Sequence, residues 1–360
     1  MRASPHCRHT SHWQGSPAWR EPRWLVGVGG KAGIGSKYTG LHGIPGSLVL
    51  VSTDITDITG SKPARTIDAA ALWRINQRLQ SAAQAPWLHG EVGRRMAQRL
   101  PVIRLQPARV LDWWSFSGGS ADDLRQAYPQ SELLLLEPAV HRLQADNPAP
   151  PRAAPWWSMQ RWRGPKPQTL TESDLQAGSV ELVWANMGLH RWADPQAAFQ
   201  QWQRALAVDG FLMFSTLGPG SLTAVQTIYS RSGWPPPFAP FVDMHDLGDM
   251  LVAAGFADPV MDQELLTLTW PDAQAALKEL RQLGGNAHPA RAPGLRTRRW
   301  REALLGALAE QAGPDGRLGL TFEVVYGHAF KPPPRARVAP ITHVPVEDLR
   351  RMAQSSRPKA

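Results

Sequence analysis

The sequence predicts an α/β fold in which helices cover both faces of a mostly parallel sheet. From residue 66 onward, apolar runs of strand length alternate with segments whose apolar residues recur at helical spacing. The run ELLLLE at 132–137 is almost continuously apolar, which is typical of a strand buried on both faces. The chain has 360 residues and 42% hydrophobic content, enough for one large domain or two small ones.

The first half of this region is predicted to form two helices and then a strand, a helix and a second strand. Asp68 is suited to cap the first helix, because an aspartate just before an apolar periodic segment accepts hydrogen bonds from free backbone amides. The expected elements are helices over 66–80 and 90–100, a strand over 108–112, a helix over 120–128 and a strand over 132–137.

The second half continues the alternation. Asp194 is expected to cap a helix whose first position is Pro195, and Gly255 to end a later one. Asp243 and Asp246, three residues apart, are read as a helix cap. The expected elements are strands over 179–186, 210–216, 265–270 and 319–330, helices over 194–206 and 241–256, and mostly helical sequence over 271–316.

Composition excludes several classes of function. The net charge is +9, but residues 1–65 hold eight Lys/Arg against three Asp/Glu, so the rest of the chain is only mildly basic and no nucleic-acid partner is expected. No uncharged stretch reaches the roughly 18 apolar residues of a membrane span. Cys7 is the single cysteine, and the histidines lack metal-ligand spacing, so we expect no internal disulfide, no metal and a reducing, cytoplasmic setting.

The two ends of the chain differ from its middle. Residues 1–65 contain ten glycines and no sustained period, and the run GVGGKAGIGSK fits neither the Walker nor the dinucleotide pattern. We expect this segment to be disordered or an over-extended gene start, and residues 331–360 to form a flexible basic tail. The remaining 66–330 is predicted to be one domain, with a helical insertion over 270–317.

Polar residues at three strand ends mark the expected binding site. Ligands of open α/β sheets bind outside the carboxyl ends of the strands. Asp112 ends the first strand, and Glu137 ends the second at the distance where an acid accepts hydrogen bonds from ribose hydroxyls. Asn186 ends the next strand and would lie beside a donor and an acceptor. The alternative to ligand binding is that Glu137 is simply a polar residue at a strand end and that Asn186 is an ordinary turn asparagine.

The region from 179 to 222, SVELVWANMGLHRWADPQAAFQQWQRALAVDGFLMFSTLGPGSL, resembles class I S-adenosylmethionine-dependent methyltransferases. FVDMHDLGDMLVAAGFADPVMDQELLTLTW and HPARAPGLRTRRW…LTFEVVYGHAF narrow the resemblance to the malonyl-acyl-carrier-protein O-methyltransferases of biotin synthesis, over about residues 75–332. It implies a seven-stranded, mostly parallel Rossmann-like sheet with an inserted helical lid. It also implies methyl transfer from S-adenosylmethionine to the free carboxylate of malonyl-acyl-carrier protein or malonyl-CoA.

The first motif departs from the family pattern D-L-G-C-G-x-G. Asp112 and Gly118 match its acid and its last glycine, whereas Trp114 and Phe116 stand at the first two glycines. A bulky aromatic is strained at positive φ and fills space that a donor needs. It can also attract a sulfonium by a cation–π interaction of about 0.5–2 kcal/mol. The loop is therefore either rebuilt around Ser115 and the neighbouring amides, or it has lost the donor.

The acceptor side is expected around NMGLHRW. His190 is the candidate catalytic residue, because it could offset the charge of an acceptor carboxylate, and Trp192 could line the same side. An arginine of the lid could offset that charge instead, and His190 would then be an ordinary packed or exposed histidine. The arginines between 291 and 301 are either a solvated helix face or a docking surface for an acidic carrier protein. A non-catalytic carrier-binding protein and a methyltransferase for another acidic substrate are the alternative functions.

Overall fold

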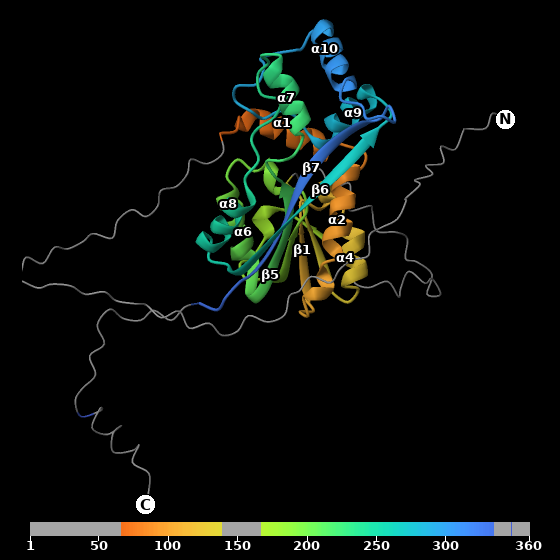
Figure 1. The fold of residues 1–360 in the computed structure, drawn as a ribbon. Coiled ribbons are helices and arrows are strands. Elements are labelled where there is room, and N and C mark those ends of the chain that lie inside the picture. The colour runs from red at the N-terminus through yellow and green to blue at the C-terminus, as the bar shows by residue number, and fades with distance from the viewer. Residues whose placement is uncertain (1–65, 139–166, 335–346, 348–360) are drawn as a thin grey trace, which may run out of the picture. The chain divides into compact units, whose positions relative to one another are not determined.

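A computed structural model describes residues 66–138, 167–334 and 347 of the chain. The expectations for residues 1–65 and for most of the tail lie outside these described residues. Within them, strands and helices alternate along the chain, and the helices lie on both sides of one sheet (Figure 1).

The sheet has seven strands in the order β3-β2-β1-β4-β5-β7-β6. Strands β1 to β5 pair in parallel, whereas β7 is antiparallel to both β5 and β6. This order is that of the class I methyltransferase fold and confirms the predicted fold class. The strands are β1 (Arg109–Trp113), β2 (Glu132–Leu136), β3 (Gln168–Leu170), β4 (Val180–Ala185), β5 (Leu206–Leu217), β6 (Ala257–Trp270) and β7 (Leu318–Phe330).

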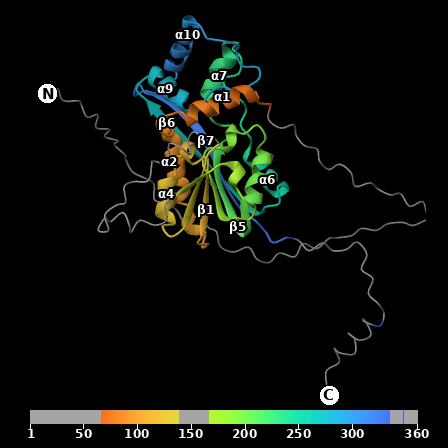
Figure 2. The same ribbon diagram turned by 180° about the vertical axis from the view of Figure 1, so that it is seen from behind.

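The helices form two layers and a group at one end of the sheet. Helices α2 and α4 cover one face, α6 and α8 cover the other, and α1, α7, α9 and α10 gather beyond one end, as both views show (Figures 1 and 2). The helices are α1 (Ala69–Gln80), α2 (Trp87–Ala97), the one-turn α3 (Ser115–Gly118), α4 (Ala121–Ala127), α6 (Pro195–Ala205), α7 (Thr223–Arg231), α8 (Met244–Ala253), α9 (Ala273–Leu280) and α10 (Arg298–Ala309).

Side-chain alternation along the central strands builds a hydrophobic core on each face of the sheet. On β4, Trp184 packs into the core shared with α2, α4 and α7, whereas Val183 packs into the core shared with α6 and α8. Phe211 and Leu212 of β5 divide in the same way. Burying one such side chain stabilises the fold by about 1.5–3 kcal/mol, so the strands with both faces covered form the most stable part of the sheet.

The predicted elements agree with the structure except at its periphery. Asp68, Asp194 and Asp243 each accept a backbone hydrogen bond at a helix start, as predicted. The three-residue edge strand β3 and helix α7 were not predicted, because neither has a long apolar period. Strand β6 begins eight residues before the predicted 265, because pairing with β7 extends an edge strand whose side chains are mostly exposed.

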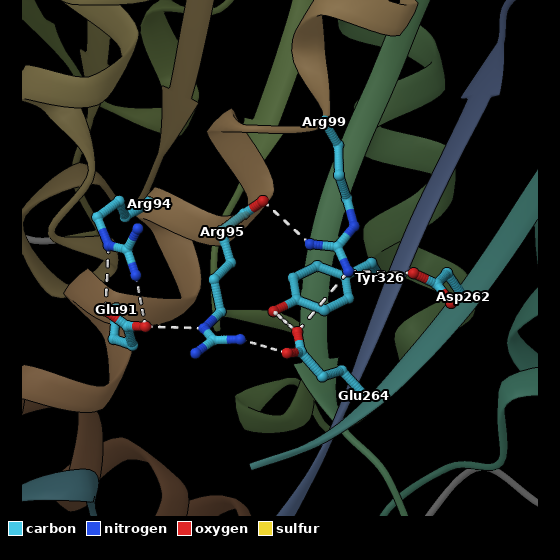
Figure 3. Close-up of polar contacts among 7 residues, drawn as sticks. All are labelled: Glu91, Arg94, Arg95, Arg99, Asp262, Glu264 and Tyr326. Atoms are coloured by element: carbon cyan, nitrogen blue, oxygen red, sulfur yellow. Dashed lines mark hydrogen bonds and ion pairs between the residues drawn. The ribbon is translucent and has the colours of Figure 1, made fainter. Parts of the chain in front are cut away.

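A group of charged side chains ties α2 to the antiparallel edge of the sheet (Figure 3). Arg95 pairs with Glu91 on its own helix and with Glu264 on β6. Arg99 pairs with Asp262 and places its guanidinium 3.9 Å from the ring centroid of Tyr326. Most of these side chains are partly buried, but they remain in contact with solvent, where ion pairs contribute about 0–1 kcal/mol each, so the group mainly orients α2.

Gly327 marks a close approach within β7. A Cβ at this position would collide with the ring of Phe214 and lie 2.9 Å from Sδ of Met261. We predict that Gly327→Ala lowers the free energy of unfolding by about 1–3 kcal/mol, because overpacked cores must shift. Urea unfolding measures it. Gly319→Ala on the same strand is the control, since its Cβ would meet only Thr267 Cγ2 at 3.6 Å. Equal effects of the two substitutions would contradict the prediction.

Candidate functional site

The candidate site lies where the strand order reverses, at the carboxyl ends of β1 and β4. The structure brings the polar strand ends together through the loop after β1. The Phe116 amide donates to Oε1 of Glu137 at 2.6 Å, and Nδ2 of Asn186 donates to the Gly118 carbonyl at 2.6 Å. Asp112 lies at the start of the same loop. All six predicted cofactor-binding residues therefore lie in one region; their roles as ligands remain predictions.

The loop after β1 is built as a tight turn with a tryptophan in a conformation that favours glycine. Trp114 has φ 55°, and the single turn α3 follows it and ends at Gly119 with φ 67°. The Trp114 carbonyl accepts from the Gly118 amide at 2.9 Å. Met187, directly after Asn186, also has a positive φ of 51°. A left-handed residue of this kind costs about 1–2 kcal/mol, and such strain concentrates at functional sites.

The Trp114 side chain is packed within the protein. Its ring stacks on Trp192 at 5.4 Å between centroids and 13° between planes, and only 6% of the residue is exposed. The guanidinium carbon of Arg191 lies 5.0 Å from the centroid of the same ring. A Cβ added at Gly188 would be 3.6 Å from Cε3 of Trp114. The tryptophan thus forms a wall between the loop and the segment after β4.

Asp112 is a buried carboxyl group with one oxygen engaged. Its Oδ2 accepts from the Ser115 hydroxyl at 2.6 Å, whereas Oδ1 has no hydrogen-bond partner among the described residues. Burial, opposed by the Ser115 hydrogen bond and helped by the charge of Glu137, raises the pKa of Asp112 to about 7. A hydrogen-bond donor on a ligand would satisfy Oδ1 and favour the ionised form.

Asn186 joins four parts of the chain. Its amide donates to the carbonyls of His89 on α2, at 2.7 Å, and of Gly118 in the loop. Its Oδ1 accepts from the Ser215 hydroxyl of β5 at 2.6 Å. Helix α2 comes this close because of Gly93, where a Cβ would lie 2.8 Å from Nδ2. The side chain thereby positions the loop and α2 against the ends of β4 and β5.

Two buried basic side chains were missed by the sequence analysis. His89 is fully buried. Its Nδ1 lies 2.6 Å from the Ser117 carbonyl oxygen, which can only accept a hydrogen bond, so Nδ1 carries the proton. Burial and the charge of Arg191 lower the pKa of His89 to about 3, which keeps it neutral. Arg191 is 4% exposed and donates through Nη2 to the Ser117 hydroxyl at 2.7 Å. Burial lowers its pKa to about 10.

A mostly apolar cavity of about 240 Å³ adjoins this cluster. His190 and Arg191 line it from the 3₁₀ turn η4 (Leu189–Arg191), while α1, α7 and the insertion between β6 and β7 supply apolar walls. The apolar lining includes Ile75 of α1, Tyr229 of α7, Leu277 and Leu280 of α9, Leu217 of β5, Phe322 of β7 and Phe241 of the segment before α8. The cavity can hold a flexible neutral chain beside the loop after β1.

The insertion is tied to α1 next to the cavity. Arg291 pairs with Asp68 at 2.6 Å, and the Asp68 amide donates to the Ala287 carbonyl at 2.9 Å. Arg291 is thus engaged in an ion pair, whereas Arg298 pairs with Glu302 on the surface of α10 and Arg296 lies over the Trp300 ring. The arginines between 291 and 301 therefore include one structural residue and a surface group.

Comparison with known proteins assigns the family. No family model matches the chain. The malonyl-[acyl-carrier protein] O-methyltransferase of Gallionella capsiferriformans is 39% identical over 254 residues, covering 69% of this chain and 85% of that protein. The protein of the same name from Laribacter hongkongensis is 38% identical over 260 residues, covering 71% and 86%. This chain belongs to the malonyl-[acyl-carrier protein] O-methyltransferase family.

Proteins of solved structure are less similar in sequence to this chain than the two methyltransferases above. The YcgJ protein of Bacillus subtilis aligns with 66% of this chain and 98% of its own, at 12% identity and a TM-score of 0.43. The fold assignment rests on the strand order instead. Within the described residues, no helix is long and apolar enough to cross a membrane, and no three His, Cys, Asp or Glu side chains cluster as metal ligands.

The raised pKa of Asp112 predicts a pH dependence of stability. In the unfolded chain the pKa of Asp112 has its ordinary value of 3.8. The contribution of Asp112 to the free energy of unfolding is therefore fully present below about pH 4 and is lost as the pH rises through about 7. We expect the free energy of unfolding of the parent protein, relative to Asp112→Asn, to fall by about 2.5 kcal/mol between about pH 5 and pH 8. Urea titrations of both proteins measure this; equal pH profiles would contradict it.

The packed Trp114 predicts that a glycine here costs stability. Trp114→Gly relieves about 1–2 kcal/mol of backbone strain but removes a buried indole worth about 3–5 kcal/mol. We expect a net loss of about 2–3 kcal/mol in denaturant unfolding. Asp209→Gly is the control, because Asp209 also has a positive φ, 63°, but is exposed. This control should gain a little stability; a gain in Trp114→Gly would show that its packing contributes little.

Proposed function

We propose that this family member transfers a methyl group from S-adenosylmethionine to the free carboxylate of a malonyl thioester during biotin synthesis. The observation that carries the proposal is the 39% identity to the Gallionella capsiferriformans enzyme over 85% of that protein. The acyl-carrier protein or CoA bearing the malonyl group is the partner. The single Cys7 agrees with work in a reducing cytoplasm.

The residues around the loop after β1 fit the donor. Asp112 offers an unpartnered buried oxygen, and Glu137 stands at the end of β2, where ribose hydroxyls bind in this class of sheet. Phe116 and Gly118 contribute the loop backbone, Trp114 its wall, and Asn186 fixes it in place. When bound, S-adenosylmethionine supplies an electrophilic methyl group on a positively charged sulfur.

The acceptor needs little acid–base help. A carboxylate of pKa about 4 is already ionised at neutral pH and is therefore a ready nucleophile. The chain must orient the acceptor, exclude water and offset its charge. The cavity supplies apolar walls for the first two tasks, and His190, which lines it, is our candidate for contact with the acceptor.

A second candidate function follows from Trp114. Trp114 stands at a motif position where the family has glycine. Its ring packs against Trp192 and Arg191. A protein of this fold that had lost the donor could still bind the acyl carrier without catalysis. A methyltransferase acting on another acidic substrate is a further alternative, since mostly apolar cavity walls can accommodate other acyl groups as well as malonyl.

Donor binding and methylation separate these functions. Calorimetric titration of the full chain with S-adenosylmethionine should give saturable heat, and radiolabelled donor should methylate malonyl-acyl-carrier protein and malonyl-CoA. Acetyl-acyl-carrier protein, which lacks the free carboxylate, is the matched control and should remain unlabelled. No heat at millimolar donor would favour the non-catalytic protein. Heat without malonyl methylation would favour another acidic substrate.

A further inference from the structure

Arg191 is a buried cation without a carboxylate partner among the described residues. Its Nη2 donates to Ser117 Oγ at 2.7 Å and its Nη1 reaches Asn76 Oδ1 at 3.5 Å, while Nε has no hydrogen-bond partner. All of its polar contacts are thus with neutral groups. The guanidinium also lies 5.0 Å from the centroid of the Trp114 ring, which attracts a cation but does not neutralise it.

Two other arginines, one beside the cavity and one on α2, are paired with carboxylates. Arg291 contacts Asp68, and Arg95 contacts two carboxylates. Against the effect of burial, the charge of Glu137 raises the pKa of Arg191, and Oε1 of Glu137 accepts a hydrogen bond from the Phe116 amide. An unpaired buried charge costs several kcal/mol of folding free energy, so an anion that reached Arg191 would be strongly attracted.

The cavity decides which anion can reach Arg191. Arg191 and His190 form a polar part of a wall that is otherwise largely apolar. The exposed Arg281 also lines the cavity, so a second positive charge lies on its solvent side. A matching molecule has an anionic end that reaches Arg191, a neutral middle in the apolar part of the cavity and a negatively charged part near Arg281. A malonyl thioester of a phosphate-bearing carrier has these three parts.

We propose that Arg191 binds the free carboxylate of the acyl acceptor and thereby selects malonyl over uncharged acyl thioesters. This inference rests on the proposed function. The carboxylate forms hydrogen bonds with the guanidinium, which orients it toward the donor side of the cavity. In the transfer, the methyl–sulfur bond of the donor breaks, the sulfur leaves as a neutral thioether, and the carboxylate oxygen forms the new bond of a neutral ester. The product therefore loses the attraction that held the substrate. Arg191 is therefore also expected to favour release of the product.

The test measures binding without the donor, so that turnover plays no part. Calorimetry on the full chain compares malonyl-CoA with its methyl ester and with acetyl-CoA. We expect the parent protein to prefer malonyl-CoA by at least about tenfold, since charge-assisted hydrogen bonds contribute that much. Arg191→Met should bind the three ligands equally, and Arg191→Lys should keep part of the preference. Arg231→Met, an exposed arginine of α7 outside the cavity lining, should behave like the parent.

A second arm examines the other carboxylate, that of the donor itself. The parent and Arg191→Met are titrated with S-adenosylmethionine and with its decarboxylated form. If the substitution removes the preference between these two donors and leaves the preference for malonyl-CoA, the proposal is overturned. A parent protein without preference for malonyl-CoA also overturns it. Preference without methylation would leave Arg191 as the anchor and reject only the proposed reaction.

Folding of the variants is checked by near-ultraviolet circular dichroism. Replacing a buried charge by an apolar side chain of similar length is often neutral or stabilising, so Arg191→Met is expected to fold. If it does not, Arg191→Gln, which can still donate to Ser117, takes its place under the same criteria.

Discussion

The site depends on the buried amide of Asn186. This one side chain holds the carbonyls of His89 and Gly118 and accepts the hydroxyl of Ser215, so it connects α2, the loop after β1 and the ends of two central strands. Each of these groups is buried, and a buried carbonyl without a donor costs about 1–3 kcal/mol. The approach is possible only because Gly93 leaves room for the amide. The geometry of the loop therefore follows from packing at one point.

Charge is distributed unevenly around this point. Asp112 and Glu137 lie on the side of β1 and β2, and Arg191 lies on the side that faces the cavity. His89, which lies near Arg191, is neutral, because burial and the nearby guanidinium oppose its protonation. A cationic donor near the acids and an anionic acceptor near the arginine would meet with opposite charges facing each other. Such an arrangement suits a reaction between a sulfonium and a carboxylate.

In the loop after β1, side-chain packing takes the place of the conformational freedom of glycine. In a glycine loop the backbone adopts a positive φ at no steric cost. Here Trp114 adopts the same φ, and its stack on Trp192 and contact with Arg191 offset the strain. The aromatic side chain thus has a structural account that does not require contact with a sulfonium. It also contacts Arg191 at the cavity wall, which links the altered motif to the cavity.

The sequence alone determined the central strands and most helices, because apolar periodicity and helix caps act over a few residues. The resemblance of its longer segments to known sequences also indicated the family. The sequence also placed Asp112, Glu137 and Asn186 together, since the carboxyl ends of adjacent parallel strands meet at one edge. Only the tertiary structure decided the position of Arg191, which stands between His190 and Trp192 in the sequence. Its side chain is buried and contacts Ser117, 74 positions away. Contacts over such separations depend on how α2, the loop and η4 pack in three dimensions, and no local pattern of residues encodes that.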